Sequence, residues 1–157
     1  MKLKYRLIVG IIAISTIVLS LPDLTNTYIF GIEPAAAQSM ASSDAWRQVY
    51  QRLPEFPLEN KYITKKTRKV SENQTLARRL IRYHIYLKGR SPNSRLDWKL
   101  TLADYLGANE IIYDSSYPGS DTLSKNPLDG DRAAIASLNR AQRNQLIQVL
   151  ISIFNQK

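Results

Sequence analysis

The residues that could carry out chemistry are few in this sequence, and most of them are carboxylates. His84 is the only histidine, so a histidine metal site or a serine, histidine and carboxylate relay has a single imidazole to use. Glu55 with Glu59, or Asp104 with Glu110, could supply the general acid and base of a glycan hydrolase. No regular element forces either pair together. We therefore predict no catalytic residue, no metal site and no cofactor, and keep a small envelope hydrolase as the alternative to a binding protein.

The beginning of the chain predicts export. Three basic residues among the first six precede an apolar run over residues 7–21, which is the pattern of a secretory signal. This run is shorter than the roughly 20 residues that cross a bilayer, so an uncleaved membrane anchor is the weaker alternative. Small residues before Gln38 place the expected cleavage between Ala37 and Gln38. Because the sequence has no cysteine, neither a disulfide nor a lipid-anchor cysteine is available.

Hydrophobic periodicity predicts that the exported part is all-α. We expect a signal peptide over residues 1–37, a flexible leader over 38–43 and a single helical domain over 44–157. The domain should be a small bundle of four to five helices with long irregular connections. The expected helices cover residues 44–53, 72–88, 95–106, 131–138 and 140–154.

Capping signals and apolar spacing set the expected ends and inward faces of these helices. The expected N-terminal caps are Ser43 or Asp44, Ser71 with Gln74, Asn93 or Ser94, and Asn139 with Gln142. Gly89 should end the second helix. Leu96, Leu100, Ala103 and Leu106 should face inward from the third helix. The apolar arc of the last helix is too wide for a surface helix, which predicts that this helix forms the centre of the core.

Positive charge is concentrated in one part of the chain. The net charge is +9, and residues 61–99 contain twelve lysines and arginines against only Glu72 and Asp97. Residues 104–131 are acidic, with six carboxylates and one lysine. A segregated cationic segment attracts anionic partners and speeds their encounter, and salt screens this effect over about 8–10 Å. The segment therefore selects the sign of a partner and leaves its identity open.

We predict a binding patch within this cationic segment. The predicted patch consists of Lys61, Lys65, Lys66, Arg68, Lys69, Arg78, Arg79 and Arg82. Aromatic residues interleaved with the cations would suggest a nucleic acid partner in a cytoplasmic protein, but export disfavours nucleic acid. The expected partner is then an acidic exported protein or an anionic membrane surface. The simpler interpretation, left open, is a solvated face that only keeps the protein soluble.

Two stretches resemble exported cyanobacterial proteins. The processing sequence Pro34-Ala35-Ala36-Ala37-Gln38 is similar to theirs, and the block Arg95-Leu96-Asp97-Trp98-Lys99-Leu100-Thr101-Leu102-Ala103-Asp104-Tyr105-Leu106-Gly107 resembles an uncharacterised family of them. The resemblance covers most of residues 56–154. It implies the thylakoid lumen or the periplasm as the compartment, and it brings no activity and no functional residues. The sequence thus predicts a non-enzymatic binding or accessory protein that docks through its basic patch.

Overall fold

The helices account for almost all of the regular structure. The computed structural model describes residues 35–155, with side chains described from Asp44 onward. In this range it forms α1 (Ala35–Arg52), α2 (Leu76–Arg82), α3 (Arg95–Tyr105), α4 (Leu128–Ser137) and α5 (Arg140–Phe154). A π-helical turn over Tyr83–Leu87 extends α2, and a 3-10 turn covers Asp114–Ser116. Over the described residues there are isolated β-bridges and no longer strand, which confirms the predicted all-α class.

The predicted leader over residues 38–43 forms part of α1. α1 begins at Ala35, so neither Ser43 nor Asp44 caps it, and residues 38–43 are helical. Alanine has the highest helix propensity, and residues 35–53 contain no glycine or proline. The predicted cleavage site between Ala37 and Gln38 lies in the first turn of α1. The rest of the predicted signal peptide lies outside the described residues.

The start of α2 also differs from the prediction. Thr75 caps it, with its hydroxyl accepting from the Arg78 amide at 3.3 Å, so the predicted capping box of Ser71 and Gln74 is wrong. The reason is tertiary: the Leu76 amide donates to the carbonyl of Leu58 at 2.9 Å, which holds the preceding residues as a connection.

The end of this helix follows the prediction. Lys88 closes the π-helical turn by donating to the Tyr83 carbonyl at 3.0 Å. Gly89 then adopts the left-handed conformation expected of a helix C-terminus, with φ +59°.

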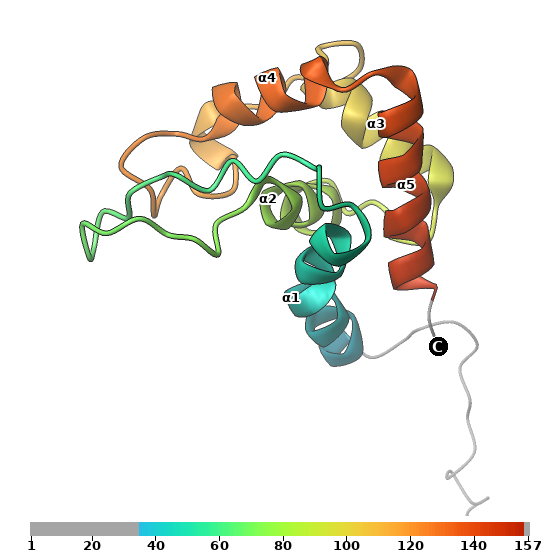
Figure 1. Cartoon of the computed structure of the whole chain (residues 1–157), viewed down its shortest axis with the longest axis horizontal. Helices are drawn as coiled ribbons and strands as arrows, with labels where there is room; N and C mark the ends of the chain where they lie inside the picture. Colours follow the sequence, from blue (N-terminus) through green and yellow to red (C-terminus); the bar gives the residue numbers. More distant parts are fainter. Residues whose placement is uncertain (1–34, 156–157) are drawn as a thin grey trace, which may run out of the picture. The chain divides into compact units, whose positions relative to one another are not determined.

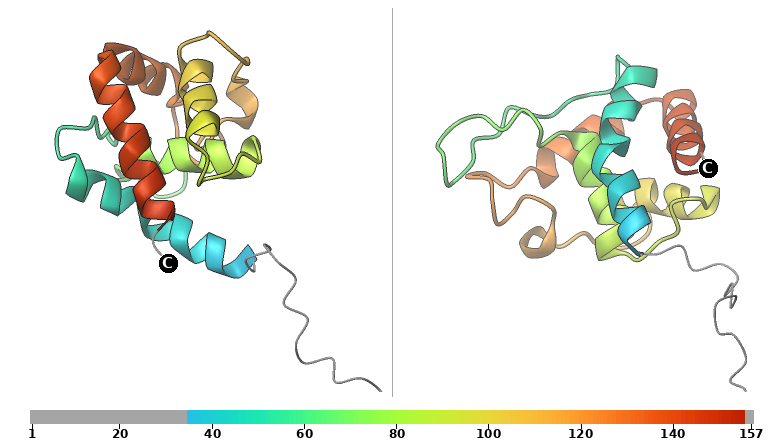
Figure 2. Two further views of the ribbon diagram at one scale, coloured as in Figure 1. Left: turned by 90° about the vertical axis from the view of Figure 1, so that its right-hand side faces the viewer. Right: turned by 90° about the horizontal axis from the view of Figure 1, so that it is seen from below.

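α2 forms the centre of the core (Figures 1 and 2). Its residues Leu76, Ala77 and Leu80 are fully buried, and the turn that follows adds Tyr83. α5, which the sequence predicted as the central helix, buries one face against α1 and α3 and leaves the other exposed. Asn139 and Gln142 form the predicted capping box at its start. No helix in the described part of the chain combines the length and apolar character that crossing a membrane requires.

The inward face of α3 is not the predicted leucine face. Leu96 and Leu106 are 64% and 41% exposed, whereas Trp98, Leu102 and Tyr105 are buried. α3 has apolar residues on more than one side, so spacing alone does not choose between them. The buried aromatic rings bring polar atoms that find partners, as Trp98 does when its indole N–H donates to the Pro92 carbonyl at 2.8 Å. The predicted cap Ser94 is confirmed, since its hydroxyl accepts from the Asp97 amide.

His84 joins α2 to α3 through a buried stack. Its ring lies against the Trp98 ring, with the centroids 3.5 Å apart and the planes 7° from parallel. Nε2 lies 3.1 Å from the Ser91 carbonyl oxygen, which can only accept, so Nε2 carries the proton. Nδ1 then accepts from the Thr101 hydroxyl at 2.8 Å. His84 is thus completely buried, with a hydrogen-bond partner for each ring nitrogen.

Burial lowers the pKa of His84 to about 4, from an ordinary value near 6.5, because the desolvated ring cannot easily hold a charge. Below pH 6.5 the unfolded chain binds a proton that the folded chain refuses. The free energy of unfolding should therefore fall as the pH decreases from about 6.5 to 4, by on the order of 3 kcal/mol. Urea unfolding across this range measures the loss, and NMR of the ring gives the pKa directly.

A His84→Gln variant is the control for this prediction, because the chain has no other histidine. It should be less stable than the natural protein at every pH, yet its stability should stay level between pH 6.5 and 5. A ring that titrates near 6.5 in the folded protein would contradict the prediction.

Candidate binding surface

Residues 61–70, called here the basic loop, form a short hairpin that projects beyond the helices (Figures 1 and 2). The Thr64 amide donates to the Lys69 carbonyl at 2.9 Å, and an antiparallel bridge pairs Ile63 with Val70. The turn between them is closed by Arg68, which donates its amide to the Thr64 carbonyl at 3.1 Å. The loop therefore holds a defined shape within one of the long connections that the sequence predicted to be irregular.

A second segment supports the other side of the hairpin. Thr64 forms an antiparallel bridge with Leu123. The Lys65 amide donates to the Thr122 carbonyl at 2.9 Å, and the Ser124 amide donates to the Ile63 carbonyl at 2.8 Å. The connection between α3 and α4 is thus the surface on which the basic loop is built.

The exposed side chains of the basic loop are cations and aliphatics. Its cations are Lys61, Lys65, Lys66, Arg68 and Lys69, and all of them are exposed. Ile63 and Val70 are 44% and 54% exposed. Because residues that face each other across an antiparallel bridge point to the same side, these two side chains form one apolar spot beside the cations.

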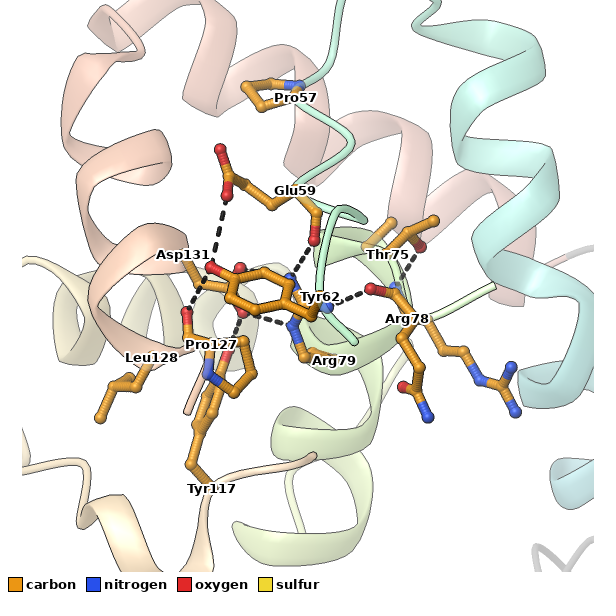
Figure 3. Close-up of polar contacts among 12 residues, drawn as sticks. Pro57, Glu59, Tyr62, Thr75, Arg78, Arg79, Tyr117, Pro127, Leu128 and Asp131 are labelled. Carbon is orange, nitrogen blue, oxygen red and sulfur yellow. Dashed lines mark hydrogen bonds and ion pairs between the residues drawn. The ribbon is translucent and has the colours of Figure 1, made fainter. Parts of the chain in front are cut away.

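Arg79 is fully buried and holds the basic loop to the helices through its hydrogen bonds (Figure 3). Its Nε and Nη2 atoms donate to the two carboxylate oxygens of Asp131 at 2.6 and 2.5 Å, a bidentate ion pair between α2 and α4. Nη2 also donates to the Glu59 carbonyl at 2.7 Å, and Nη1 donates to the Gln74 carbonyl. One guanidinium therefore ties both ends of the connection that carries the basic loop to the helical core.

Tyr62 covers this ion pair on the side of the loop. Its ring lies over the Arg79 guanidinium, with the central carbon 5.1 Å from the ring centroid. Burial, followed by the negative charges of Asp131 and Glu59, raises the pKa of Tyr62 to about 12. Gly130 packs so close that a Cβ there would collide with the Tyr62 hydroxyl. The first residues of the basic loop are therefore fixed on α4 as well as on α2.

Two tyrosines complete the surroundings of Asp131. The Tyr117 hydroxyl donates to Asp131 Oδ2 at 2.5 Å, and the Tyr105 hydroxyl lies 2.7 Å from that of Tyr117. Burial raises the pKa of Tyr117 far above its ordinary value, so it stays a donor, and Tyr105 must donate to it in turn. Burial also raises the pKa of the Asp131 carboxyl, while the hydrogen bonds from Arg79 and Tyr117 act against this. Asp131 raises the pKa of Arg79 in spite of burial, which keeps the pair ionic.

The structure thus divides the predicted patch. Five of its members lie in the basic loop, and Arg79 is removed from the binding residues because no part of it is exposed. Arg78 and Arg82 lie on α2, where repulsion from Arg82 and Arg47 adds to burial in lowering the pKa of Arg78. Figure 3 shows the side chains of Arg78 and Arg79 leaving the helix in different directions.

The spacing of apolar residues around Arg79 indicates that this arginine is buried, although net charge alone placed it in the predicted patch. Arg79 follows Leu76 by three residues and precedes Tyr83 by four, so it lies on the apolar stripe of its helix. Asp131 sits in the same way between Leu128 and Ile135 on α4. A charged residue within an apolar stripe indicates a buried pair, since an unpaired buried charge is costly. Neither stripe tells which carboxylate meets which cation.

The proposed carboxylate pair Asp104 and Glu110 is occupied by cations. Asp104 is buried and accepts from Arg90 Nη1 at 2.5 Å, and Glu110 accepts from Arg90 Nη2 at 3.0 Å and from Lys88 at 2.5 Å. Burial raises the pKa of Asp104, but hydrogen bonds, first from Arg90, outweigh it and lower that pKa. Asp104 is therefore an anion held inside the fold.

The members of the second proposed pair, Glu55 and Glu59, have different surroundings. Glu59 accepts from the Tyr62 hydroxyl at 3.4 Å, and Glu55 is exposed beside Phe56. Within residues 44–155 no cluster of three or more histidine or carboxylate side chains is arranged to hold a metal ion.

Cations of the basic loop differ from those nearer the core. Within the described residues, the carboxylates pair with Arg47, Arg79, Lys88 and Arg90, and no ion pair involves a cation of the basic loop.

In comparisons with known proteins, no protein family, curated protein or solved structure matches this chain.

Replacement of Arg79 tests its structural role. Arg79→Met should lower the free energy of unfolding by about 3–5 kcal/mol, because it leaves the Asp131 carboxylate buried without a partner. The double variant Arg79→Met/Asp131→Leu should recover much of this loss, since it removes both charges. Chemical denaturation measures the three proteins, and Arg82→Met, on the exposed side of the same helix, should change stability by less than about 0.5 kcal/mol. Equal effects of Arg79→Met and Arg82→Met would contradict the assignment.

Proposed function

We propose that this protein is an exported, non-enzymatic binding protein whose basic loop docks it on an anionic membrane surface in the thylakoid lumen or the periplasm. The observation that carries the proposal is the exposure of five cations on one projecting hairpin, with no carboxylate paired to them among the described residues. Each cation held near an anionic bilayer contributes about 1 kcal/mol to binding. Five such residues on one hairpin are enough for strong, salt-sensitive attachment.

The apolar spot favours a bilayer over an acidic protein as the partner. Ile63 and Val70 stand together between the cations, and Leu58, just before the loop, is 49% exposed. Aliphatic side chains beside cations are typical of segments that lie in the headgroup region, where the cations meet phosphates and the aliphatics enter the boundary of the acyl chains.

The backbone of the loop supports a functional role for its charge. Arg68 has φ +56°, a left-handed conformation that costs about 1 kcal/mol for a residue other than glycine. The loop thus presents an arginine at a position where glycine would be less strained, which is consistent with a role for the cation itself.

The two carboxylate pairs predicted for a glycan hydrolase give this alternative little support. Asp104 is buried and bound by Arg90, and Glu59 is held by Tyr62. Neither can be offered to a sugar together with its proposed partner without breaking these contacts.

Binding to phosphatidylglycerol vesicles at low salt tests the proposal. Lys66→Gln/Lys69→Gln should weaken binding about thirtyfold, because it removes two cations whose side chains do not hold the loop together. Arg82→Gln/Arg95→Gln removes the same charge from α2 and α3 and is the matched control, with an expected loss of no more than severalfold. Sedimentation with vesicles measures both, and circular dichroism checks that helicity is retained. Equal losses in the two variants would show that overall charge, and not the basic loop, drives binding.

A second pair of variants separates the bilayer from an acidic protein. Ile63→Ser/Val70→Ser should weaken vesicle binding about tenfold through loss of buried apolar area. The same variant should bind soluble polyglutamate as well as the natural protein does, since all cations remain. Unchanged vesicle binding in this variant would overturn the bilayer as the partner and favour an acidic protein.

A further inference from the structure

A second surface, away from the basic loop, is a groove between α3 and α5. It is an open hollow of about 290 Å³. Its apolar part is formed by Leu102 and Leu106 on one side and Ile147 on the other. Lys99, Arg140 and Arg143 are the cations among its lining residues. We call this hollow the α3–α5 groove.

The charges of the groove are all of one sign. No carboxylate lines it, and its three cations take part in no ion pair among residues 44–155. Two of them, Arg140 and Arg143, lie in the first turn of α5, which contains no acidic residue. Positive charge is unfavourable at a helix N-terminus, where the backbone N–H groups already point outward. The placement of these arginines therefore does not stabilise α5 and instead concentrates positive potential at the groove.

The apolar part restricts which anion fits. Leu102 and Ile147 are buried at the bottom of the groove, and Leu106, 41% exposed, forms part of its wall. A free inorganic anion would leave this apolar surface wet, and a neutral hydrocarbon would leave the cations unused. A ligand with a short hydrocarbon body and one terminal anionic group satisfies both.

We propose that the α3–α5 groove binds a small amphiphilic carboxylate, with the hydrocarbon on Leu102, Leu106 and Ile147 and the carboxylate among Lys99, Arg140 and Arg143. Octanoate, a hydrocarbon chain with one terminal carboxylate, has this chemistry. This site is independent of the basic loop and does not rest on the proposed docking function.

Titration of the purified protein with octanoate, followed by the backbone amide signals in ¹H–¹⁵N NMR spectra, tests the proposal. Saturable shifts should cluster at α3 and at the first turns of α5, with a dissociation constant on the order of 1 mM. Acetate has the charge without the body and octanol has the body without the charge. Each should shift these signals less than a tenth as strongly at the same concentration.

Variants identify the residues that carry the binding. Arg140→Gln/Arg143→Gln should weaken octanoate binding about tenfold and leave α5 folded, because it removes charges that oppose the helix dipole. Ala103→Leu keeps every cation but fills the groove, and should abolish the shifts. Lys66→Gln/Lys69→Gln removes equal charge from the basic loop and should leave octanoate binding unchanged.

These experiments test the α3–α5 groove separately from the basic loop. Loss of octanoate binding in the α5 and Ala103 variants, with octanoate binding retained in Lys66→Gln/Lys69→Gln, supports an independent site for an amphiphilic carboxylate. Equal shifts with octanol, equal shifts with acetate, or unchanged octanoate binding in Arg140→Gln/Arg143→Gln would each overturn it. None of these results depends on whether the basic loop binds vesicles.

Discussion

The bidentate ion pair between Arg79 and Asp131 is the interaction on which the rest of the structure depends. It joins α2 to α4 at a point where both side chains are fully buried, and backbone carbonyls and the Tyr117 hydroxyl satisfy the remaining hydrogen-bonding capacity. Such a pair is no more stabilising than a well-packed apolar contact, but a single unpaired member is strongly destabilising. The pair therefore fixes which helices meet and how the connection from Glu59 to Gln74 leaves the core.

The acidic segment of the chain neutralises part of its basic segment. Members of the acidic segment, residues 104–131, neutralise the basic residues nearest the core: Asp131 binds Arg79, while Asp104 and Glu110 bind Arg90. The cations without a carboxylate partner in the described structure include those of the projecting basic loop and of the rim of the α3–α5 groove. Folding thus turns a long cationic segment into separate cationic surfaces with different apolar surroundings.

These surfaces offer different kinds of contact. The basic loop presents cations around the exposed pair Ile63 and Val70, which suits a flat anionic surface. The α3–α5 groove is concave and encloses its apolar residues beneath the cations, which suits a small molecule. Both stand on a core whose polar groups, such as His84 and Asp104, are internally hydrogen-bonded. That internal pairing leaves the surface cations available for partners.

The sequence by itself determined the helical class, the capping box at Asn139, the helix end at Gly89 and the concentration of positive charge, because periodicity, capping and composition are local properties. It did not determine which face of α3 is buried, that α2 rather than α5 is central, or that Arg79 lies inside. Arg79 meets a carboxylate 52 residues away, and that encounter depends on how α2 and α4 pack. Arg78 and Arg79 contribute equally to the net charge, and only the tertiary structure decides which of the two is buried.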